Sequence, residues 1–390
     1  MKNKKKKICM LAARHSPFDA RITYKEGMSL KNAGYEIVVI APYKNKFSNF
    51  NGIKIIGFKM LKRSMRRANT LINLVYWGIK TKADVYHCHE VDTSLFAGIW
   101  IKKILKWRGI KAKLIYDSHE HWPALWSQQS SFLILRKMIY FIVNYWEKWA
   151  LKHCDAVFTA NKIVKKHLLS LNRKTKIEVL YNCPTLKPLQ NKQNNKKLSH
   201  TTITICHEGM LNFDRGLREM IECIKKIKEE LNNNIRLLII GDIFIEKEKK
   251  WLRKKIIEYK LEKNIEITGW LLYPKINKKI QKCNIGLILF KPTLNNQLAG
   301  PPNKLFNYMQ HGLPVIAPNF CFETKDIINK INCGLLVDAI KTKNIYNSIK
   351  YMLINKEEAK KMGENGRKAV LEKYNWENES KKLLKVYQNL

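Results

Sequence analysis

Long uncharged apolar runs are missing from this chain of 390 residues, although 45% of its residues are hydrophobic. A helix that spans a bilayer needs about twenty apolar residues, and Arg136 and Lys137 interrupt the best candidate. The basic start, Met1–Lys7, precedes only a strand-length apolar run with no cleavage site of small residues. We therefore expect a globular protein with neither a transmembrane helix nor a signal peptide.

Cysteine patterns are also missing. The nine cysteines are odd in number, scattered, and never spaced as a disulfide framework or a metal knuckle. This excludes a disulfide-stapled secreted domain and favours the reducing cytoplasm.

Acidic residues are scarce: 32 Asp and Glu stand against 73 Lys and Arg, a net charge of +41. Part of this surplus reflects a composition rich in Lys, Asn and Ile, as AT-rich genomes encode. A surplus of this size predicts attraction to anionic surfaces such as phospholipid, polyphosphate or nucleic acid. No aromatic-basic recognition motif accompanies the charge, so we expect no nucleic-acid partner.

Short apolar runs alternate with helix-length segments in two series along the chain. The runs span 8–13, 37–41, 53–58, 84–88, 113–116 and 156–159, then 202–206, 236–240, 265–268 and 285–290. Such alternation predicts doubly wound parallel sheets. The polar, lysine-rich stretch 186–200 is typical of a linker. We therefore expect an α/β protein with an N-terminal domain at 1–185 and a C-terminal domain at 201–374.

Polar residues follow the strands of the first series, where doubly wound sheets bind ligands. These residues are His15, Asp19, Arg21, His87, His89, Glu90, Asp117, His119, Glu120 and Asn161. In the second half the stretch Leu298–Pro318, LAGPPNKLFNYMQHGLPVIAP, predicts a loop, a helix, a turn and a buried strand. A helix entered from a lysine-bearing loop offers free N–H groups and a positive dipole end, which suits a phosphate or diphosphate.

Eight motifs occur in one order: Asp19-x-Arg21, DVYHCHEVDTS at 84–94, YDSHEHWP at 116–123, DAVFTAN at 155–161, YNCP at 181–184, Gly209 with Arg215-Gly216, LIIGD at 238–242 and PPNKLFNYM at 301–309. Together they resemble the family-4 glycosyltransferases of the GT-B fold, in the branch that carries a PNK motif. The resemblance covers nearly the whole chain. It implies two Rossmann-like parallel-sheet domains facing across a cleft, with a last helix at about 375–390 packed on the first domain.

The same resemblance implies transfer of a sugar, with retention, from a UDP- or GDP-sugar, without a cofactor or metal. His89, Arg215 and Lys304 correspond to catalytic positions. Donor-binding positions are Gly209, Arg215, Gly241, Asn303, Lys304 and Asn307, and acceptor or cleft positions are Asp19, Arg21, Glu90, Asp117, His119 and Glu120. Arg215 and Lys304 would neutralise the leaving diphosphate.

Some positions depart from the family pattern. Ala299 and Asn307 occupy positions where many relatives carry two glutamates, and Met210 replaces an expected arginine. An amide at 307 loses the charge-assisted grip of a carboxylate on the ribose hydroxyls. A catalytically degenerate paralogue, retained as a binding subunit of a glycosyltransferase complex, is therefore the alternative function. An epimerase of the same fold is a further one, which the PPNKLFNYM segment disfavours.

Several of these residues have simpler interpretations. His87 lies two positions from His89 on one strand face and suits a core histidine. Asp117 could cap the following helix, and Asp19 with Arg21 could form a surface ion pair. The two histidines of SHEHWP, His119 and His121, resemble metal ligands but lack further ligands at zinc spacing. Gly241 suits either strand–helix packing or close approach of the donor.

Two stretches suit helices that lie on a membrane surface: Met60–Lys82 and Phe132–Trp149. Each mixes basic residues with interfacial aromatics over a length too short to span a bilayer. For Phe132–Trp149 an interpretation as domain core is at least as good, so Met60–Lys82 is the preferred contact with anionic lipid. We expect a cytoplasmic protein, peripheral on the inner face of the plasma membrane, with a membrane-held acceptor for polysaccharide, lipopolysaccharide or glycolipid synthesis.

Overall fold

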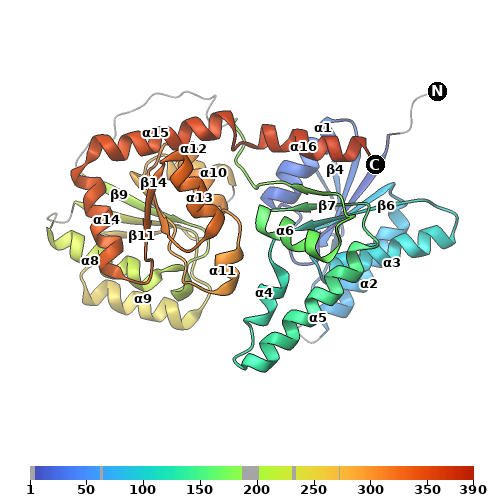
Figure 1. The fold of residues 1–390 in the computed structure, drawn as a ribbon, viewed down its shortest axis with the longest axis horizontal. Helices are drawn as coiled ribbons and strands as arrows, with labels where there is room; N and C mark the ends of the chain where they lie inside the picture. Colours follow the sequence, from blue (N-terminus) through green and yellow to red (C-terminus); the bar gives the residue numbers. More distant parts are fainter. Residues whose placement is uncertain (1–4, 62–64, 187–201, 231–233, 272) are drawn as a thin grey trace. The chain divides into compact units, whose positions relative to one another are not determined.

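The computed structural model describes residues 5–61, 65–186, 202–230, 234–271 and 273–390 (Figure 1). The chain divides into two compact units, which we call unit 1 (Met1–Asn182 with Glu377–Leu390) and unit 2 (Cys183–Trp376). The expected linker at 186–200, apart from Leu186, lies outside the described residues.

Unit 1 is built on a sheet that has eight strands within the described residues, in the order β3-β4-β2-β1-β5-β6-β7-β8. The strands are β1 (Lys7–Leu11), β2 (Glu36–Pro42), β3 (Phe47–Phe50), β4 (Ile53–Phe58), β5 (Val85–Cys88), β6 (Lys113–Ser118), β7 (Ala156–Thr159) and β8 (Ile177–Val179). All pairs are parallel except β3 with β4. Strands that are apolar on both faces predict a sheet covered by helices on both sides.

The helices of unit 1 are η1 (Ala20–Gly27, a π-helix), α1 (Met28–Asn32), α2 (Arg66–Thr81), α3 (Thr93–Trp107), α4 (Trp122–Ser127), α5 (Leu133–Leu151), α6 (Lys162–Leu171) and α16 (Trp376–Gln388). One sheet face, with Tyr86 and Cys88, forms a core with α2, α3, α5 and α6. The alternate residue, His87, contacts Tyr387 of α16 on the opposite face. In Figure 1, α1 and α16 lie above this sheet and α2, α3 and α5 below it.

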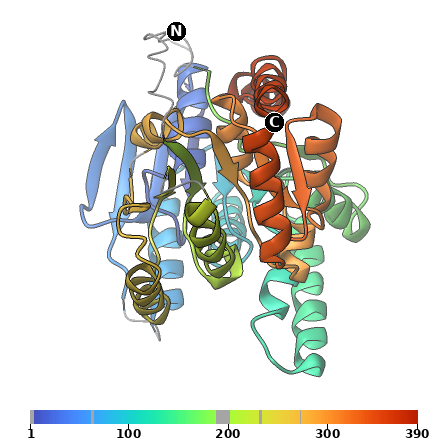
Figure 2. The same cartoon turned by 90° about the vertical axis from the view of Figure 1, so that its left-hand side faces the viewer.

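Unit 2 carries a sheet with six strands within the described residues, in the order β11-β10-β9-β12-β13-β14. The strands are β9 (Ile203–Glu208), β10 (Ile235–Ile240), β11 (Ile265–Ile267), β12 (Ile285–Leu287), β13 (Val315–Pro318) and β14 (Gly334–Val337). All of these pairs are parallel. Figure 2 shows this sheet, at the centre of unit 2, from the side.

The helices of unit 2 are η2 (Phe213–Arg215, a 3-10 turn), α8 (Leu217–Glu230), α9 (Glu246–Glu258), α10 (Tyr273–Ile280), α11 (Leu294–Leu298), α12 (Asn303–Gln310), α13 (Phe322–Ile331), α14 (Thr342–Ile354) and α15 (Lys356–Glu372). One sheet face forms a core with α8, α9 and α14. Helix α12 lies on the other face, where Gly286 makes room for it because a Cβ there would lie 2.3 Å from the Tyr308 ring.

The expected α/β class with two parallel-sheet domains is confirmed, and most predicted strands lie where the apolar runs predicted them. Three short strands, β3, β8 and β14, were not predicted, because each is too short or too exposed for its pattern to stand out. Helix α16 packs on unit 1 through Tyr387 and through Glu379, which accepts a bond from the Tyr181 N–H. No helix in the described ranges combines the length and apolarity needed to cross a bilayer.

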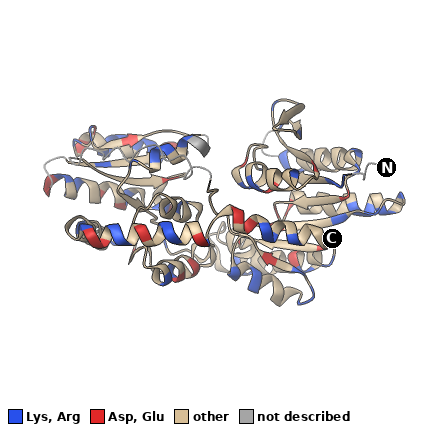
Figure 3. Ribbon diagram, turned by 90° about the horizontal axis from the view of Figure 1, so that it is seen from above, with Lys and Arg blue, Asp and Glu red and all other residues tan. Residues whose placement is uncertain are grey.

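The charge surplus is not confined to one element. In Figure 3 lysines and arginines occur on helices of both units. Net charge alone therefore does not identify a binding face.

Candidate functional site

The entrance of α12 brings a buried lysine close to the start of a helix. The helix begins at Asn303 after Pro302, and no side chain caps its first turn. The first N–H groups of a helix lack intrahelical acceptors and, with the helix dipole, attract anions. Asn303 is exposed at this entrance, whereas Lys304 is only 6% exposed. The predicted loop–helix–turn–strand order of Leu298–Pro318 is confirmed.

Lys304 is held among other nitrogen groups. Its Nζ lies 3.1 Å from Nε2 of His207, a fully buried residue of β9. Nζ of Lys304 and Cζ of Arg215 lie 5.5 and 5.9 Å from the centre of the same Phe290 ring. Burial and the charge of Arg215 lower the pKa of Lys304 to about 7. The two predicted phosphate-binding cations therefore converge, and one of them is poised to gain a proton near an anion.

Asn307 faces a carboxylate that the sequence motifs did not reveal. Its Nδ2 donates to Oε1 and Oε2 of Glu208 at 2.8 and 2.9 Å, and both side chains are buried. The Glu208 N–H donates to the Tyr308 hydroxyl at 2.8 Å, which ties β9 to α12. The sequence predicted a donor-binding role for Asn307, and the structure shows that its amide nitrogen is bonded to Glu208. A carboxylate is therefore present at this site, supplied by the end of β9 rather than by α12.

Gly209 and Gly241 form a close backbone contact at the ends of β9 and β10. A Cβ on Gly241, whose φ is +151°, would lie 2.2 Å from the Gly209 carbonyl oxygen. Gly209 also has a positive φ, +92°, with open space beside it. This contact joins the ends of two strands, so it corresponds to neither strand–helix packing nor approach of the donor, and both interpretations of Gly241 stay untested. Next to Gly209, Met210 contributes its backbone carbonyl, which accepts from Nη1 of Arg215 at 3.3 Å.

Unit 1 carries a buried charge network on the α16 side of its sheet. Arg21 donates from Nε and Nη2 to the two carboxylate oxygens of Asp117, both at 2.8 Å. Its Nε also lies 2.9 Å from Oε1 of Glu26. All three side chains are buried. Burial tends to raise the pKa of Asp117, but the charges of Arg21 and His119 hold it well below its usual range. Burial and the Asp117 charge raise the pKa of Glu26.

His87 and His89 stack on each other beside this network, with ring centres 4.5 Å apart, and both are fully buried. Nδ1 of His87 lies 2.8 Å from the Tyr387 hydroxyl. Nδ1 of His89 lies 3.5 Å from Asp117 Oδ2. Burial lowers the pKa of both histidines, so both are neutral at pH 7. The interpretation of His87 as a core histidine agrees with this bond, and His89 presents a neutral imidazole at the carboxyl end of β5.

Within the described ranges, four side chains of this network are close enough together to hold a metal ion. One ligand atom each of Glu26, His87, His89 and Asp117 lies within 4.8 Å of the others. However, Arg21 already sits against both carboxylates and supplies the positive charge that they need. A divalent cation would have to enter beside that guanidinium, at a Coulomb cost. The expectation of a metal-free site stays a prediction.

Two simpler interpretations from the sequence are wrong. Arg21 pairs with Asp117 and not with Asp19, whose Oδ1 instead accepts from the N–H groups of Arg21 and Ile22 at the start of η1. Asp117 does not cap α4, since His121 does so. The histidines of SHEHWP diverge: Nε2 of His119 lies 2.9 Å from Asp117 Oδ2, whereas His121 packs on the ring of His167.

The remaining acceptor-side residues hold loops in place. Glu90 is buried and accepts from the N–H groups of Ala13 and Arg14, which joins the end of β1 to the end of β5. Asp19 Oδ2 lies 3.1 Å from His15 Nδ1. Glu120 is half-buried, and its carbonyl accepts from the Ser118 hydroxyl. Glu90 is therefore a buried structural carboxylate, while Asp19 and Glu120 remain partly accessible.

Sequence reasoning missed four participants: Glu26, His207, Glu208 and Tyr387. Glu26 follows Arg21 inside a helical segment, where a charge is usually solvated. His207 and Glu208 extend the apolar run 202–206 by two residues, and their position directly before Gly209 was the available signal. Tyr387 lies 300 positions from His87, so no local pattern could have indicated their contact.

Two family models match the chain: Glycosyltransferase Family 4 over residues 20–184 and Glycosyl transferases group 1 over residues 190–369. An uncharacterised glycosyltransferase of Methanocaldococcus jannaschii is 22% identical over 378 residues, which cover 92% of this chain and 91% of that protein.

Solved structures share the fold at low identity. Sucrose-phosphate synthase of Thermosynechococcus elongatus aligns with a TM-score of 0.74 and 15% identity, covering 99% of each chain. HepE of Anabaena, in complex with UDP-glucose, aligns with a TM-score of 0.74 and 13% identity, covering 98% of this chain and 100% of that one. WaaG, a glycosyltransferase involved in lipopolysaccharide biosynthesis, aligns with a TM-score of 0.72 and 13% identity, covering 97% of this chain and 99% of that one. With a family model on each unit and this shared fold, the chain belongs to the family-4 glycosyltransferases of the GT-B fold.

Proposed function

We propose that this glycosyltransferase moves a sugar, with retention at the anomeric carbon, from a nucleotide-diphosphate sugar to a membrane-associated acceptor. Unit 2 would bind the donor and unit 1 the acceptor. The observation that carries the proposal is the convergence of Lys304, Arg215 and the uncapped start of α12 around neutral His207. A pocket of this kind suits a diphosphate, because it offers two cations and free N–H groups together.

The chemistry follows from charge. As the bond between the anomeric carbon and the diphosphate oxygen breaks, negative charge grows on the leaving group. Lys304 and Arg215 would stabilise that charge without a metal ion. His89 is neutral and lies at the carboxyl end of β5, but it is fully buried, so it would hydrogen-bond the donor sugar or the reacting oxygens only after the segments that cover it move. The relatives support a UDP- or GDP-sugar in one respect: the HepE structure contains UDP-glucose.

A peripheral membrane location is part of the proposal. Helix α2 exposes Ile72 and Tyr76 but buries Leu74, so its apolar side is largely domain core. Helix α5 exposes more apolar surface, with Ile134 at 77% and Phe141 at 70%. The exposure thus favours Phe132–Trp149 over Met60–Lys82 as the lipid contact, and Lys62 and Arg63 of the latter lie outside the described residues. The inner face of the plasma membrane, in polysaccharide, lipopolysaccharide or glycolipid synthesis, suits the positive charge.

Donor binding tests the proposal. We would titrate the protein with a panel of UDP- and GDP-sugars by calorimetry, with Lys304→Gln as the variant and Lys254→Gln, on the exposed face of α9, as the matched control. Loss of a charge-assisted phosphate contact predicts about tenfold or greater weakening for Lys304→Gln and no change for the control. The proposal fails if no nucleotide sugar binds, or if both variants bind as the unmodified protein does.

Asn307 and Met210 favour one second candidate, a degenerate binding subunit of a glycosyltransferase complex. It predicts donor binding without transfer when the protein is incubated with membranes and the bound nucleotide sugar. Release of the nucleoside diphosphate with labelled glycolipid would exclude it.

A further inference from the structure

An apolar groove lies on unit 1 between α2, α3, α4 and α5. It has a volume of about 430 Å³ and is lined by Arg67, Ala68, Leu71, Asp92, Thr93, Phe96, Trp126, Ile142, Val143 and Trp146. A second hollow of about 480 Å³, along α2 and α3, shares Leu71 and Phe96 with it and reaches Trp100. The two hollows are therefore neighbours along α2 and α3, and we call them together the α2/α3/α5 groove.

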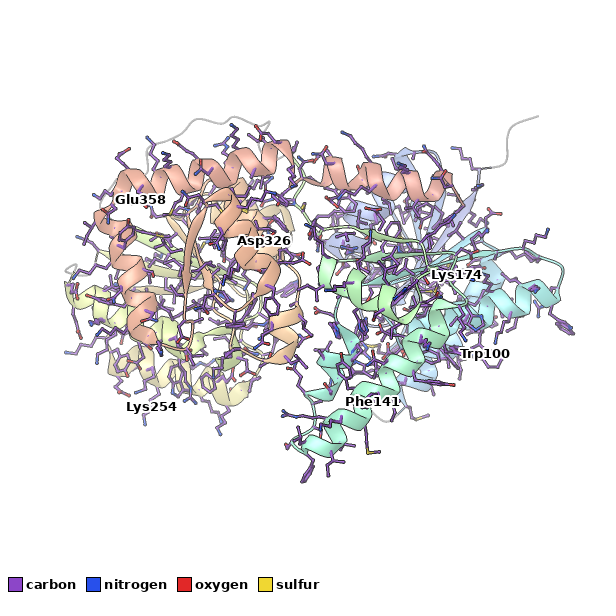
Figure 4. The ribbon with its side chains drawn as sticks, in the orientation of Figure 1. Trp100, Phe141, Lys174, Lys254, Asp326 and Glu358 are labelled. Atoms are coloured by element: carbon purple, nitrogen blue, oxygen red, sulfur yellow. The ribbon has the colours of Figure 1, made fainter. Side chains whose placement is uncertain are left out.

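The groove is open because half of α5 does not pack on the sheet. The buried residues of α5 are Val143, Glu147, Ala150 and Leu151, all in its second half. In Figure 1 the first half of α5, together with α4, extends beyond the sheet of unit 1, and Figure 4 labels Phe141 on α5 and Trp100 on α3. An exposed apolar surface of this extent is rare on a soluble monomer unless it binds something.

The groove carries one cation that no carboxylate neutralises among the described residues. Asp92 is paired with Arg14. Within the described ranges Arg67 forms no ion pair, and its guanidinium lies 5.9 Å from the centre of the Trp126 ring. An apolar groove with one free guanidinium is complementary to a hydrocarbon chain that ends in an anion.

One end of the groove adjoins the segment that follows β5. Asp92 and Thr93 line the groove and, with Val91 between, come after His89 and Glu90 in the chain. Trp146 of the groove donates from Nε1 to the Val91 carbonyl at 2.9 Å, which fixes α5 to that segment. A molecule with its chain in the groove would therefore place its head group near the carboxyl end of β5.

We propose that the α2/α3/α5 groove binds the hydrocarbon chain of a lipid-phosphate acceptor, with Arg67 on its phosphate. This inference rests on the proposed function and names the acceptor class for it. The chain lies against Leu71, Phe96 and Trp146. The exposed half of α5 contacts the bilayer from which the lipid enters. A bulk phospholipid or a partner helix would use the apolar wall but would not need Arg67.

The test measures binding of single-chain alkyl phosphates below their micelle concentration by calorimetry. Burial of a methylene predicts about fourfold tighter binding for each one added, which amounts to roughly 200-fold from octyl to dodecyl phosphate. Ala68→Trp fills the groove from an exposed position, so it weakens dodecyl phosphate at least tenfold and flattens the chain-length dependence. The matched control is Ala33→Trp, also at an exposed position of unit 1.

A comparison of head groups distinguishes a lipid phosphate from a bulk phospholipid as the ligand of the groove. Dodecyl phosphate should bind at least tenfold more tightly than dodecylphosphocholine, and Arg67→Gln should abolish that preference. The inference is overturned if affinity does not depend on chain length, if Ala68→Trp binds as Ala33→Trp does, or if the two head groups bind equally, which would indicate bulk phospholipid. Binding of the panel of UDP- and GDP-sugars, measured in parallel, reports on the proposed function: if none of them binds while alkyl phosphates bind with a dependence on chain length, the function is refuted and the groove remains assigned to an alkyl phosphate.

Discussion

Replacing Asn307 by glutamate places two carboxylates against each other in the buried end of β9 and α12. The Asn307 amide nitrogen now donates to both carboxylate oxygens of Glu208 at 2.8 and 2.9 Å, and Asn307 is only 3% exposed. The substitution removes these charge-assisted bonds. Two negative charges about 4 Å apart would then repel by roughly 4 kcal/mol at an effective dielectric constant of 20.

Protonation limits this cost. The pair can share a proton, which costs about 1.4 kcal/mol for each pH unit above the ordinary glutamate pKa of about 4.3. The penalty is therefore about 3.5 kcal/mol at pH 7 and about 1 kcal/mol at pH 5. The sign follows because the folded-state pKa of the pair is raised: the protein with Asn307→Glu loses stability as pH rises from the unfolded pKa toward the folded one.

Thermal unfolding provides the assay. For a domain of this size, each kcal/mol shifts the melting temperature by about 2 to 4 °C, so Asn307→Glu should melt roughly 7 to 14 °C below the unmodified protein at pH 7. At pH 5 the difference should shrink to about 2 to 4 °C. Asn307→Gln, which keeps an amide, is the control, and the double change Glu208→Gln with Asn307→Glu should recover most of the loss.

One outcome would refute this reasoning directly: Asn307→Glu as stable as Asn307→Gln at both pH values. A gain in nucleotide-sugar affinity in Asn307→Glu would instead mean that position 307, and not Glu208, has to carry the carboxylate. That gain would favour the degenerate-paralogue alternative.

Three other perturbations have definite expected outcomes. The pKa of Lys304 is about 7, and a bound diphosphate would raise it. Affinity for UDP-glucose, measured by calorimetry, should therefore level off below pH 7 and fall by up to tenfold per pH unit between pH 7 and 9. Lys304→Gln should abolish this dependence on pH. Arg21→Gln leaves buried carboxylates unpaired and should destabilise by roughly 3 to 5 kcal/mol in thermal unfolding, whereas Arg14→Gln, in an exposed ion pair, should change stability by less than about 1 kcal/mol. Gly241→Ala would place a Cβ 2.2 Å from the Gly209 carbonyl oxygen, so it should lower the melting temperature more than Gly269→Ala does. Gly269 also has a positive φ, but open space lies beside it. Equal effects of the two substitutions would show that only the strain in φ matters.

The buried network of unit 1 explains why several polar residues at strand ends are inaccessible. Arg21, Asp117 and Glu26 neutralise one another inside the unit, and Tyr387 closes the network over His87. Such networks fix the orientation of their side chains, because a buried charge that lacks hydrogen-bond partners lowers the free energy of unfolding. His89 is held in place by its neighbours.

Local pattern predicted the periodic parts of this protein well. Continuous apolar runs predicted the buried parallel strands because strands covered on both faces need apolar residues at every position. The PPNKLFNYM segment predicted its own helix, because proline preceding a helical apolar spacing marks a helix start. The paired roles of Arg215 and Lys304 followed only from family resemblance, since 89 positions separate them in the chain.

The sequence by itself determined the α/β class, the order of the strands along the chain and the cationic entrance of α12, because these depend on spacing within short segments. Tertiary structure alone decided that Glu208 faces Asn307, that Arg21 pairs with Asp117 rather than with Asp19, and that α5 rather than α2 exposes its apolar side. Each of these depends on which distant segments fold against one another, and a side chain's charge or apolarity does not specify its partner.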